Sequence, residues 1–138
     1  MQEGCSGDPA RRAGNEYLFQ MLAETNLMTF QELGVKRIIA SCPHCFHTLG
    51  KEYGDYGGEE LEVFHHSEIL AKLQEEGKLP EVEKNGRSIT FHDPCYLGRH
   101  NKIYDSPRNI LENVAEVDKI IEMKGVYIVI INLLLYLI

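Results

Sequence analysis

Short β-branched segments alternate with helical patterns along most of this chain of 138 residues. The stretches between these segments carry apolar residues at helical spacing. Strands that alternate with helices form mainly parallel sheets, because each helix returns the chain to the end of the sheet from which it left. We therefore expect an α/β fold with a mostly parallel sheet and helices on both faces. The expected strands are residues 35–40, 61–65, 88–92 and 119–122.

Residues at the ends of the helical patterns predict where several helices begin and end. Asp8 is expected to be an N-cap, and Pro9 suits the first helical position. The pattern that follows falters at Thr25-Asn26 and then resumes as far as Gly34, a plausible C-cap. The remaining expected helices are residues 46–53, a helix capped by Ser67 that ends near Gly77, and residues 107–114.

Composition limits the class of protein. The hydrophobic content of 43% is ordinary for one globular domain, and the net charge of −7 argues against general binding to nucleic acid. Residues 1–12 are polar and lack the apolar core of a secretory leader. We therefore expect a cytoplasmic protein, in which the four cysteines serve a metal or catalytic site before disulfides.

Two cysteine motifs follow directly on expected strands. Cys42-Pro-His-Cys45 comes after one strand, and Cys95 follows another through Asp93-Pro94. Ligands of open α/β sheets gather beyond the carboxyl ends of the strands, so these cysteines are expected at one edge of the sheet. The loop before the first helix can bring Cys5 to the same edge. Asp93 is expected to form the turn before Pro94 and not to act as an acid catalyst.

The Cys-x-x-Cys turn is compatible with three kinds of chemistry. A helix that starts at this turn favours thiolate over thiol, and thiolate binds iron or zinc. A thioredoxin-like dithiol would use Cys42 and Cys45, but it gives no role to Cys5 or Cys95. Iron–sulfur binding, zinc binding and dithiol redox chemistry all remain open on spacing alone.

A zinc site would be a closed tetrahedron, usually built from two short Cys or His pairs. No second pair follows the Cys42–Cys45 turn unless histidines contribute. His44 lies inside the turn and could instead donate a hydrogen bond to cluster sulfur; for each lone histidine, a solvated or core position is the simpler interpretation. The histidines without a clean pair spacing are His44, His47, His65 and His66.

Three segments share a recognisable pattern around the cysteines: Cys5-Ser-Gly-Asp-Pro-Ala-Arg-Arg-Ala-Gly-Asn-Glu16, Ser41-Cys-Pro-His-Cys-Phe-His-Thr-Leu49 and Phe91-His-Asp-Pro-Cys-Tyr-Leu-Gly-Arg-His-Asn101. This pattern resembles the cysteine-rich (CCG) domain family, which includes a component of heterodisulfide reductase and the iron–sulfur subunits of glycolate and lactate oxidation. The resemblance covers about residues 1–124. It implies an iron–sulfur cluster-binding electron-transfer component of an oxidoreductase.

The family pattern is a lone Cys, a Cys-Cys-Gly segment and a Cys-x-x-Cys, usually present twice. The resemblance assigns Cys5 to the Cys-Cys-Gly position, Cys42 and Cys45 to the closing pair, and Cys95 to the opening of a second unit. Ser6 stands where the family has its second Cys. The resemblance implies that these four cysteines hold a [4Fe–4S]-type cluster, of cubane or non-cubane form.

The same resemblance divides the chain. Residues 1–85 match the end of a first unit and residues 86–124 the start of a second, while residues 125–138 form an atypical apolar tail. We expect an internal fragment, with a redox partner or other subunits supplying the remaining ligands, and a place at the inner face of the membrane in the full-length protein. Basic residues near the cysteines are expected to be solvated or to offset cluster charge. They are Arg11, Arg12, Arg99 and His100.

Overall fold

A computed structural model describes residues 4–80, 84 and 88–121, so the expected tail at 125–138 lies outside the described residues. The first half contains α1 (Asp8–Arg12), α2 (Glu16–Glu32), β1 (Arg37–Ala40), α3 (Pro43–His47), the π-helical turn η1 (Thr48–Glu52), the 3-10 turn η2 (Tyr53–Tyr56) and β2 (Glu62–His65). The rest comprises α4 (His66–Glu75), β3 (Ser88–His92), the π-helical turn η3 (Tyr96–His100), α5 (Asp105–Val114) and β4 (Glu116–Ile121).

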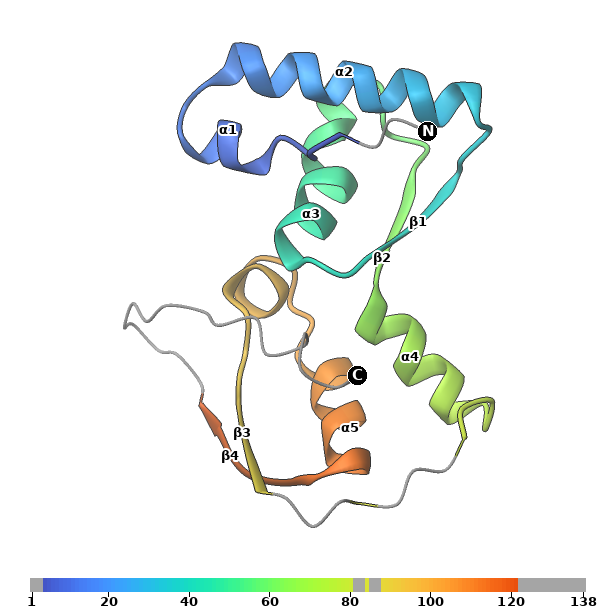
Figure 1. Cartoon of the computed structure of the whole chain (residues 1–138), viewed down its shortest axis with the longest axis vertical. Helices are drawn as coiled ribbons and strands as arrows, with labels where there is room; N and C mark the ends of the chain where they lie inside the picture. Colours follow the sequence, from blue (N-terminus) through green and yellow to red (C-terminus); the bar gives the residue numbers. More distant parts are fainter. Residues whose placement is uncertain (1–3, 81–83, 85–87, 122–138) are drawn as a thin grey trace.

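The α/β class and the parallel pairing are confirmed, but the described strands form two sheets and not one. Strand β1 pairs with β2, and β3 pairs with β4, each pair in parallel. In Figure 1, α4 leads the chain away from β1 and β2 before β3 begins. Strand β4 starts at Glu116, earlier than expected, because pairing with β3 from Ser88 onward extends it.

Helix α2 forms the upper layer of the first half (Figure 1) and buries one face. Phe19, Ala23 and Leu27 follow one another at intervals of four and pack against Tyr53 of η2. The helix continues through Thr25-Asn26, where the apolar pattern of the sequence falters before it resumes. Asn26 is buried on the inner face, where a polar side chain weakens the apolar pattern without ending the helix.

Two helix caps differ from expectation. Gly7 is the N-cap of α1, and Asp8 is the first helical residue, which frees its carboxylate for other partners. His65, and not Ser67, caps α4, with its Nδ1 accepting from the Ser67 backbone N–H. The Glu68 side chain accepts from the His65 backbone N–H and completes a capping box.

A second apolar cluster joins the two halves. It consists of Ala40 at the end of β1, Phe46 of α3 and Leu97 of η3, with Val63 and Ile103 packed against it. Leu97 is almost completely buried, and it comes from the segment that follows β3. The turns that follow β1 and β3 are therefore neighbours although their strands belong to different sheets.

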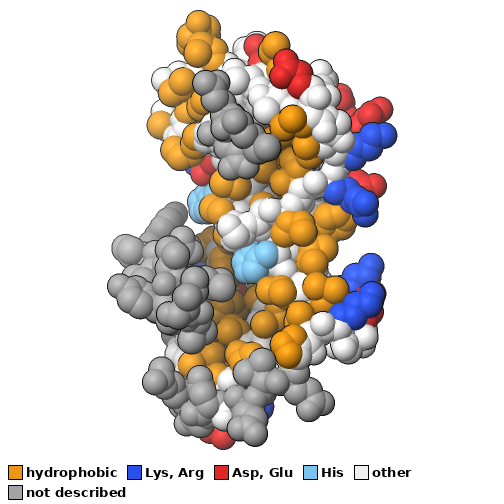
Figure 2. Space-filling view, turned by 45° about the vertical axis from the view of Figure 1, so that its right-hand side comes forward, with side chains coloured by type: hydrophobic (Ala, Val, Ile, Leu, Met, Phe, Trp, Pro, Cys, Tyr) orange, Lys and Arg blue, Asp and Glu red, His pale blue; other side chains and the backbone are white. Residues whose placement is uncertain are grey.

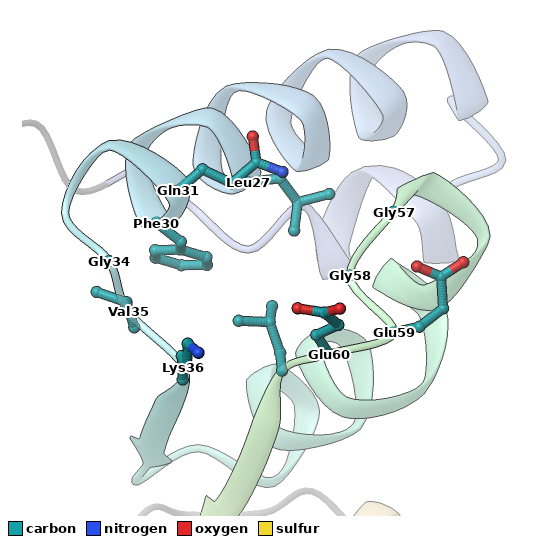
Figure 3. A pocket seen from close by; sticks show the side chains of 11 residues that line it. Leu27, Phe30, Gln31, Gly34, Val35, Lys36, Gly57, Gly58, Glu59 and Glu60 are labelled. Carbon is teal, nitrogen blue, oxygen red and sulfur yellow. The ribbon is translucent and has the colours of Figure 1, made fainter.

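An open cavity of about 470 Å³ lies at the amino ends of β1 and β2. Figure 3 shows Phe30 of α2 and Glu60 of the loop before β2 on opposite sides of this space. Val35 and Lys36, which also line it, come just before β1. The cysteine turns follow the carboxyl ends of the strands, so this cavity is not part of the cysteine region.

The surface carries both apolar and charged regions. Figure 2 shows hydrophobic side chains spread over one face and Lys and Arg side chains along its right-hand edge. Tyr17, Met21 and Met28 are exposed along the outer face of α2. Among the described residues, no helix has both the length and the apolar character that a bilayer crossing requires.

Candidate functional site

The loop that carries Cys5 is shaped by a left-handed glycine. Gly7 adopts φ of 84°, and a Cβ at this position would come within 2.8 Å of the Phe19 ring. This turn directs the Gly7 backbone N–H toward Cys5, to whose Sγ it donates at 3.4 Å. The sequence Cys-Ser-Gly therefore gives the Cys5 sulfur a hydrogen-bond donor from its own loop.

The second cysteine motif opens α3. Cys42 is the N-cap in an extended conformation, Pro43 takes the first turn, and Cys45 follows within the helix. The Phe46 backbone N–H donates to the Cys42 carbonyl at 2.9 Å and closes the turn. As the spacing predicted, both cysteines come directly after β1 and lie close enough for their thiols to interact.

The structure brings Cys5, Cys42 and Cys45 together. Burial is the largest effect on Cys45 and raises the pKa of its thiol, and the neighbouring Cys42 and Cys5 sulfurs raise that pKa further. The Ser6 hydroxyl donates to Cys45 Sγ at 3.2 Å and lowers the same pKa. Three thiols crowded in this way repel one another as thiolates, and a bound cationic centre would relieve that repulsion.

A buried carboxylate joins the two cysteine segments. Asp8 accepts from Arg12 Nε at 3.2 Å and from the Thr48 hydroxyl at 3.3 Å, and its other oxygen lies 3.0 Å from His44 Nδ1. His44 thus contacts the first cysteine loop from inside the Cys-Pro-His-Cys turn. The network fixes α1 against α3 beside the thiols.

A second buried network holds the backbone of the Cys5 loop. Asn26 Nδ2 donates to the Cys5 carbonyl at 3.0 Å and to the Tyr53 hydroxyl at 2.9 Å, and that hydroxyl donates to the Ser6 carbonyl at 3.0 Å. Burial raises the pKa of Tyr53, so its hydroxyl stays protonated as a donor. We refer to Asn26 and Tyr53 as the loop clamp.

Cys95 lies in the neighbouring segment, immediately before η3. The next residue, Tyr96, contacts the first cysteine segment, with its ring centroid 4.0 Å from that of His44. Asp93 does more than form a turn, since it is buried and paired with Arg108, whose Nε donates to it at 3.2 Å. Within residues 4–80, 84 and 88–121, no group of three or more Cys, His, Asp or Glu side chains is arranged to hold a single metal ion.

Two of the basic residues near the cysteines, Arg11 and Arg12, keep part of their side chains exposed and also form ion pairs. Arg11 donates to Glu16 at 2.7 Å, and Arg12 pairs with both Asp8 and Glu52. These ion pairs satisfy the guanidinium groups inside the chain itself. Arg99 and His100 are exposed, and the His100 ring stacks on Tyr96 with centroids 4.5 Å apart.

His65 is a further buried residue near this region, for which sequence patterns indicated only a solvated or core position. It follows β2, contacts the Ser41 backbone next to Cys42, and packs edge-on against Phe46. Burial, reinforced by neighbouring His66, lowers the pKa of His65 to about 4. His65 is therefore neutral near pH 7.

One family of known proteins matches the segments that carry these cysteines. The cysteine-rich domain model named CCG matches residues 1–50 and 89–125, more than half of the chain. The chain belongs to the CCG cysteine-rich domain family. The matched ranges contain all four cysteines of this CCG domain.

Curated relatives match nearly the whole CCG domain. The chain is 51% identical over 122 residues to the "EtfAB:quinone oxidoreductase" of Syntrophomonas wolfei and 47% identical over 123 residues to the "Probable iron-sulfur-binding oxidoreductase FadF" of Bacillus subtilis. These alignments cover 86% and 89% of the chain. It is also 33% identical over 130 residues, 91% of the chain, to one of the subunits of the dihydromethanophenazine:CoB--CoM heterodisulfide reductase of Methanosarcina mazei.

The CCG domain is short beside these relatives. It spans 17% of the length of each of the first two proteins and 32% of the third. No solved structure matches the chain.

Proposed function

We propose that this CCG domain binds an iron–sulfur cluster and serves as an electron-transfer component of an oxidoreductase related to heterodisulfide reductase. The convergence of Cys5, Cys42 and Cys45 from two distant segments carries the proposal. The names of the relatives, which include an iron-sulfur-binding oxidoreductase and part of a heterodisulfide reductase, support it.

The residues present fit such a group. Thiolates are the usual protein ligands of iron–sulfur clusters, and three thiols lie together here. Cys45 and Cys5 each receive a hydrogen bond, from the Ser6 hydroxyl and the Gly7 backbone N–H. Hydrogen bonds of this kind stabilise negative charge on ligand sulfur. A bound cluster supplies reversible one-electron transfer, while these residues bind it and set its electrostatic surroundings.

We further propose a [4Fe–4S]-type cluster with Cys5, Cys42, Cys45 and Cys95 as candidate ligands. Cys95 would come from the second unit, at residues 86–124, which approaches the first through Tyr96 and His44. A redox partner or further subunits would complete the electron path and could supply additional ligands. Free thiols persist in reducing compartments, which supports a cytoplasmic location.

Anaerobic reconstitution with iron and sulfide tests the proposal. The purified chain should gain broad visible absorption together with bound iron and sulfide. Three variants should each lose most of the bound iron, because each removes a thiolate ligand: Cys5→Ser, Cys42→Ser and Cys45→Ser. Cys95→Ser tests separately whether the second unit supplies a ligand. Ser41→Ala, which removes an exposed hydroxyl next to Cys42, is the matched control and should load normally.

Three results would contradict the proposal. A colourless protein with one zinc per chain would indicate a zinc-stabilised interaction domain. A metal-free protein whose Cys42 and Cys45 cycle between dithiol and disulfide would indicate a thiol–disulfide enzyme. Full iron content in Cys5→Ser would remove Cys5 from the ligand set.

A further inference from the structure

We propose that Ser6 tunes the redox centre through the hydrogen bond that its hydroxyl donates to the Cys45 sulfur. This inference rests on the proposed function and assigns a specific role to the residue that replaces the family's second cysteine. The Ser6 Oγ lies 3.2 Å from Cys45 Sγ, although 39 positions separate the two residues. Ser6 is 9% exposed, so little water is available to replace this contact.

The hydroxyl is directed by contacts on both sides of Ser6. The Ser6 carbonyl accepts from the Tyr53 hydroxyl at 3.0 Å, and the preceding carbonyl, of Cys5, accepts from Asn26 at 3.0 Å. On the other side, Gly7 turns the chain with φ of 84° into α1. The loop clamp and the glycine together fix the backbone of Ser6, and this backbone places its short side chain within hydrogen-bond distance of Cys45.

A serine hydroxyl and a cysteine thiol would act differently at position 6. A thiolate would add another negative ligand to the centre, whereas the hydroxyl adds none and donates a hydrogen bond to an existing sulfur. A donor to ligand sulfur stabilises the reduced, more negative state of a cluster, and hydrogen bonds to sulfur are among the factors that set cluster potential. Ser6 therefore raises the reduction potential without acting as a ligand.

Redox titration of the reconstituted chain tests this role. Ser6→Ala should keep the iron and sulfide content of the unaltered chain and shift its midpoint potential to a more negative value. Ser6→Thr retains a hydroxyl and should restore most of the potential, and Ser41→Ala should leave it unchanged. Loss of iron in Ser6→Ala would make Ser6 necessary for binding rather than for tuning, and an unchanged potential at full iron content would leave it without a tuning role. Either result overturns the proposal.

A measurement on the metal-free chain separates this inference from the proposed function. The Ser6 hydroxyl stabilises negative charge on Cys45, so iodoacetamide should alkylate Cys45 in Ser6→Ala roughly three- to tenfold more slowly than in the unaltered chain. Peptide mass spectrometry assigns the rate to Cys45, and Ser41→Ala should react at the normal rate. If neither the unaltered chain nor any variant binds iron but Ser6→Ala is alkylated more slowly, the result supports the hydrogen bond and contradicts the cluster function. Equal alkylation rates would overturn the hydrogen bond itself.

Discussion

At the scale of single residues, Gly7 combines two demands that no other residue type meets. Its φ of 84° is costly for residues with a side chain, and the space where a Cβ would stand is filled by Phe19, 2.8 Å away. Gly14 has a similar φ of 77° but no neighbouring atom within 4 Å of a Cβ. Comparing Gly7 with Gly14 therefore distinguishes the cost of backbone strain from the cost of a steric clash.

We expect Gly7→Ala to destabilise the chain by about 3 kcal/mol, from strain plus displacement of a core ring. Gly14→Ala should cost only about 1 kcal/mol, because strain acts alone there. Urea unfolding of the metal-free proteins measures both free energies. Equal losses in the two variants would mean that Phe19 moves aside without cost.

The long-range hydrogen bonds of the candidate site could not be predicted from the sequence. Cys42 and Cys45 are recognisable as a candidate pair because their spacing is local and follows a β-branched strand. Cys5 and Cys95 lie far away in the sequence, and only their loop positions and the family resemblance connect them with that pair. The contact between Tyr53 and Ser6 spans 47 positions and has no spacing rule. One signal was present: Asn26 interrupted an apolar pattern, and a polar residue on a buried helix face usually has a specific partner.

At the scale of elements, periodicity predicts the helices and strands well, since side-chain repeats are fixed within each element. The caps were harder to predict. Asp8 and Ser67 are both good capping residues, yet Gly7 and His65 occupy the two N-caps. Asp8 instead binds Arg12, Thr48 and His44, so tertiary contacts outweigh its capping preference.

The histidine cap of α4 makes stability depend on pH. The pKa of His65 falls from an ordinary value near 6.5 to about 4 in the folded chain, through burial first and the charge of His66 second. The unfolded chain therefore takes up a proton at higher pH than the folded one. The stabilising contribution of His65 is complete above pH 6.5 and is lost as pH falls toward 4, by up to about 3 kcal/mol.

Unfolding titrations between about pH 7 and pH 4 measure this dependence. To isolate the contribution of His65, the comparison is made with His65→Asn, which can cap a helix but carries no titratable ring. This variant should show a shallower fall in stability across the same range. An identical slope in both proteins would remove His65 as the source.

At the scale of the whole molecule, two small sheets are joined through side chains and not through strand pairing. Two-stranded sheets are marginal alone, so each half depends on its packing. Tyr96 supports the joint, with its ring against those of His44 and His100 and the Arg12 guanidinium 5.7 Å from its centre. The expectation of one continuous sheet was wrong because repeating strand–helix patterns predict pairing direction, and the order of strands depends on such distant contacts.

Tyr96→Ala should weaken this joint by about 1–2 kcal/mol, through lost ring contacts and apolar burial. Hydrogen exchange followed by mass spectrometry should then show faster exchange in β3 and α5 than in β1 and β2. Tyr17→Ala removes a tyrosine that is 77% exposed on α2 and should leave exchange unchanged. Uniform acceleration in both halves of Tyr96→Ala would show that they unfold together.

The loop clamp of Asn26 and Tyr53 also affects how a cofactor would be acquired. Because buried side chains hold the Cys5 and Ser6 carbonyls, the conformational entropy of this loop is lost when the chain folds. Binding a cofactor therefore costs little further loop entropy, so a larger part of the metal–sulfur bond energy contributes to affinity. On the proposed function, the loop therefore needs little reordering when the folded chain takes up iron and sulfide.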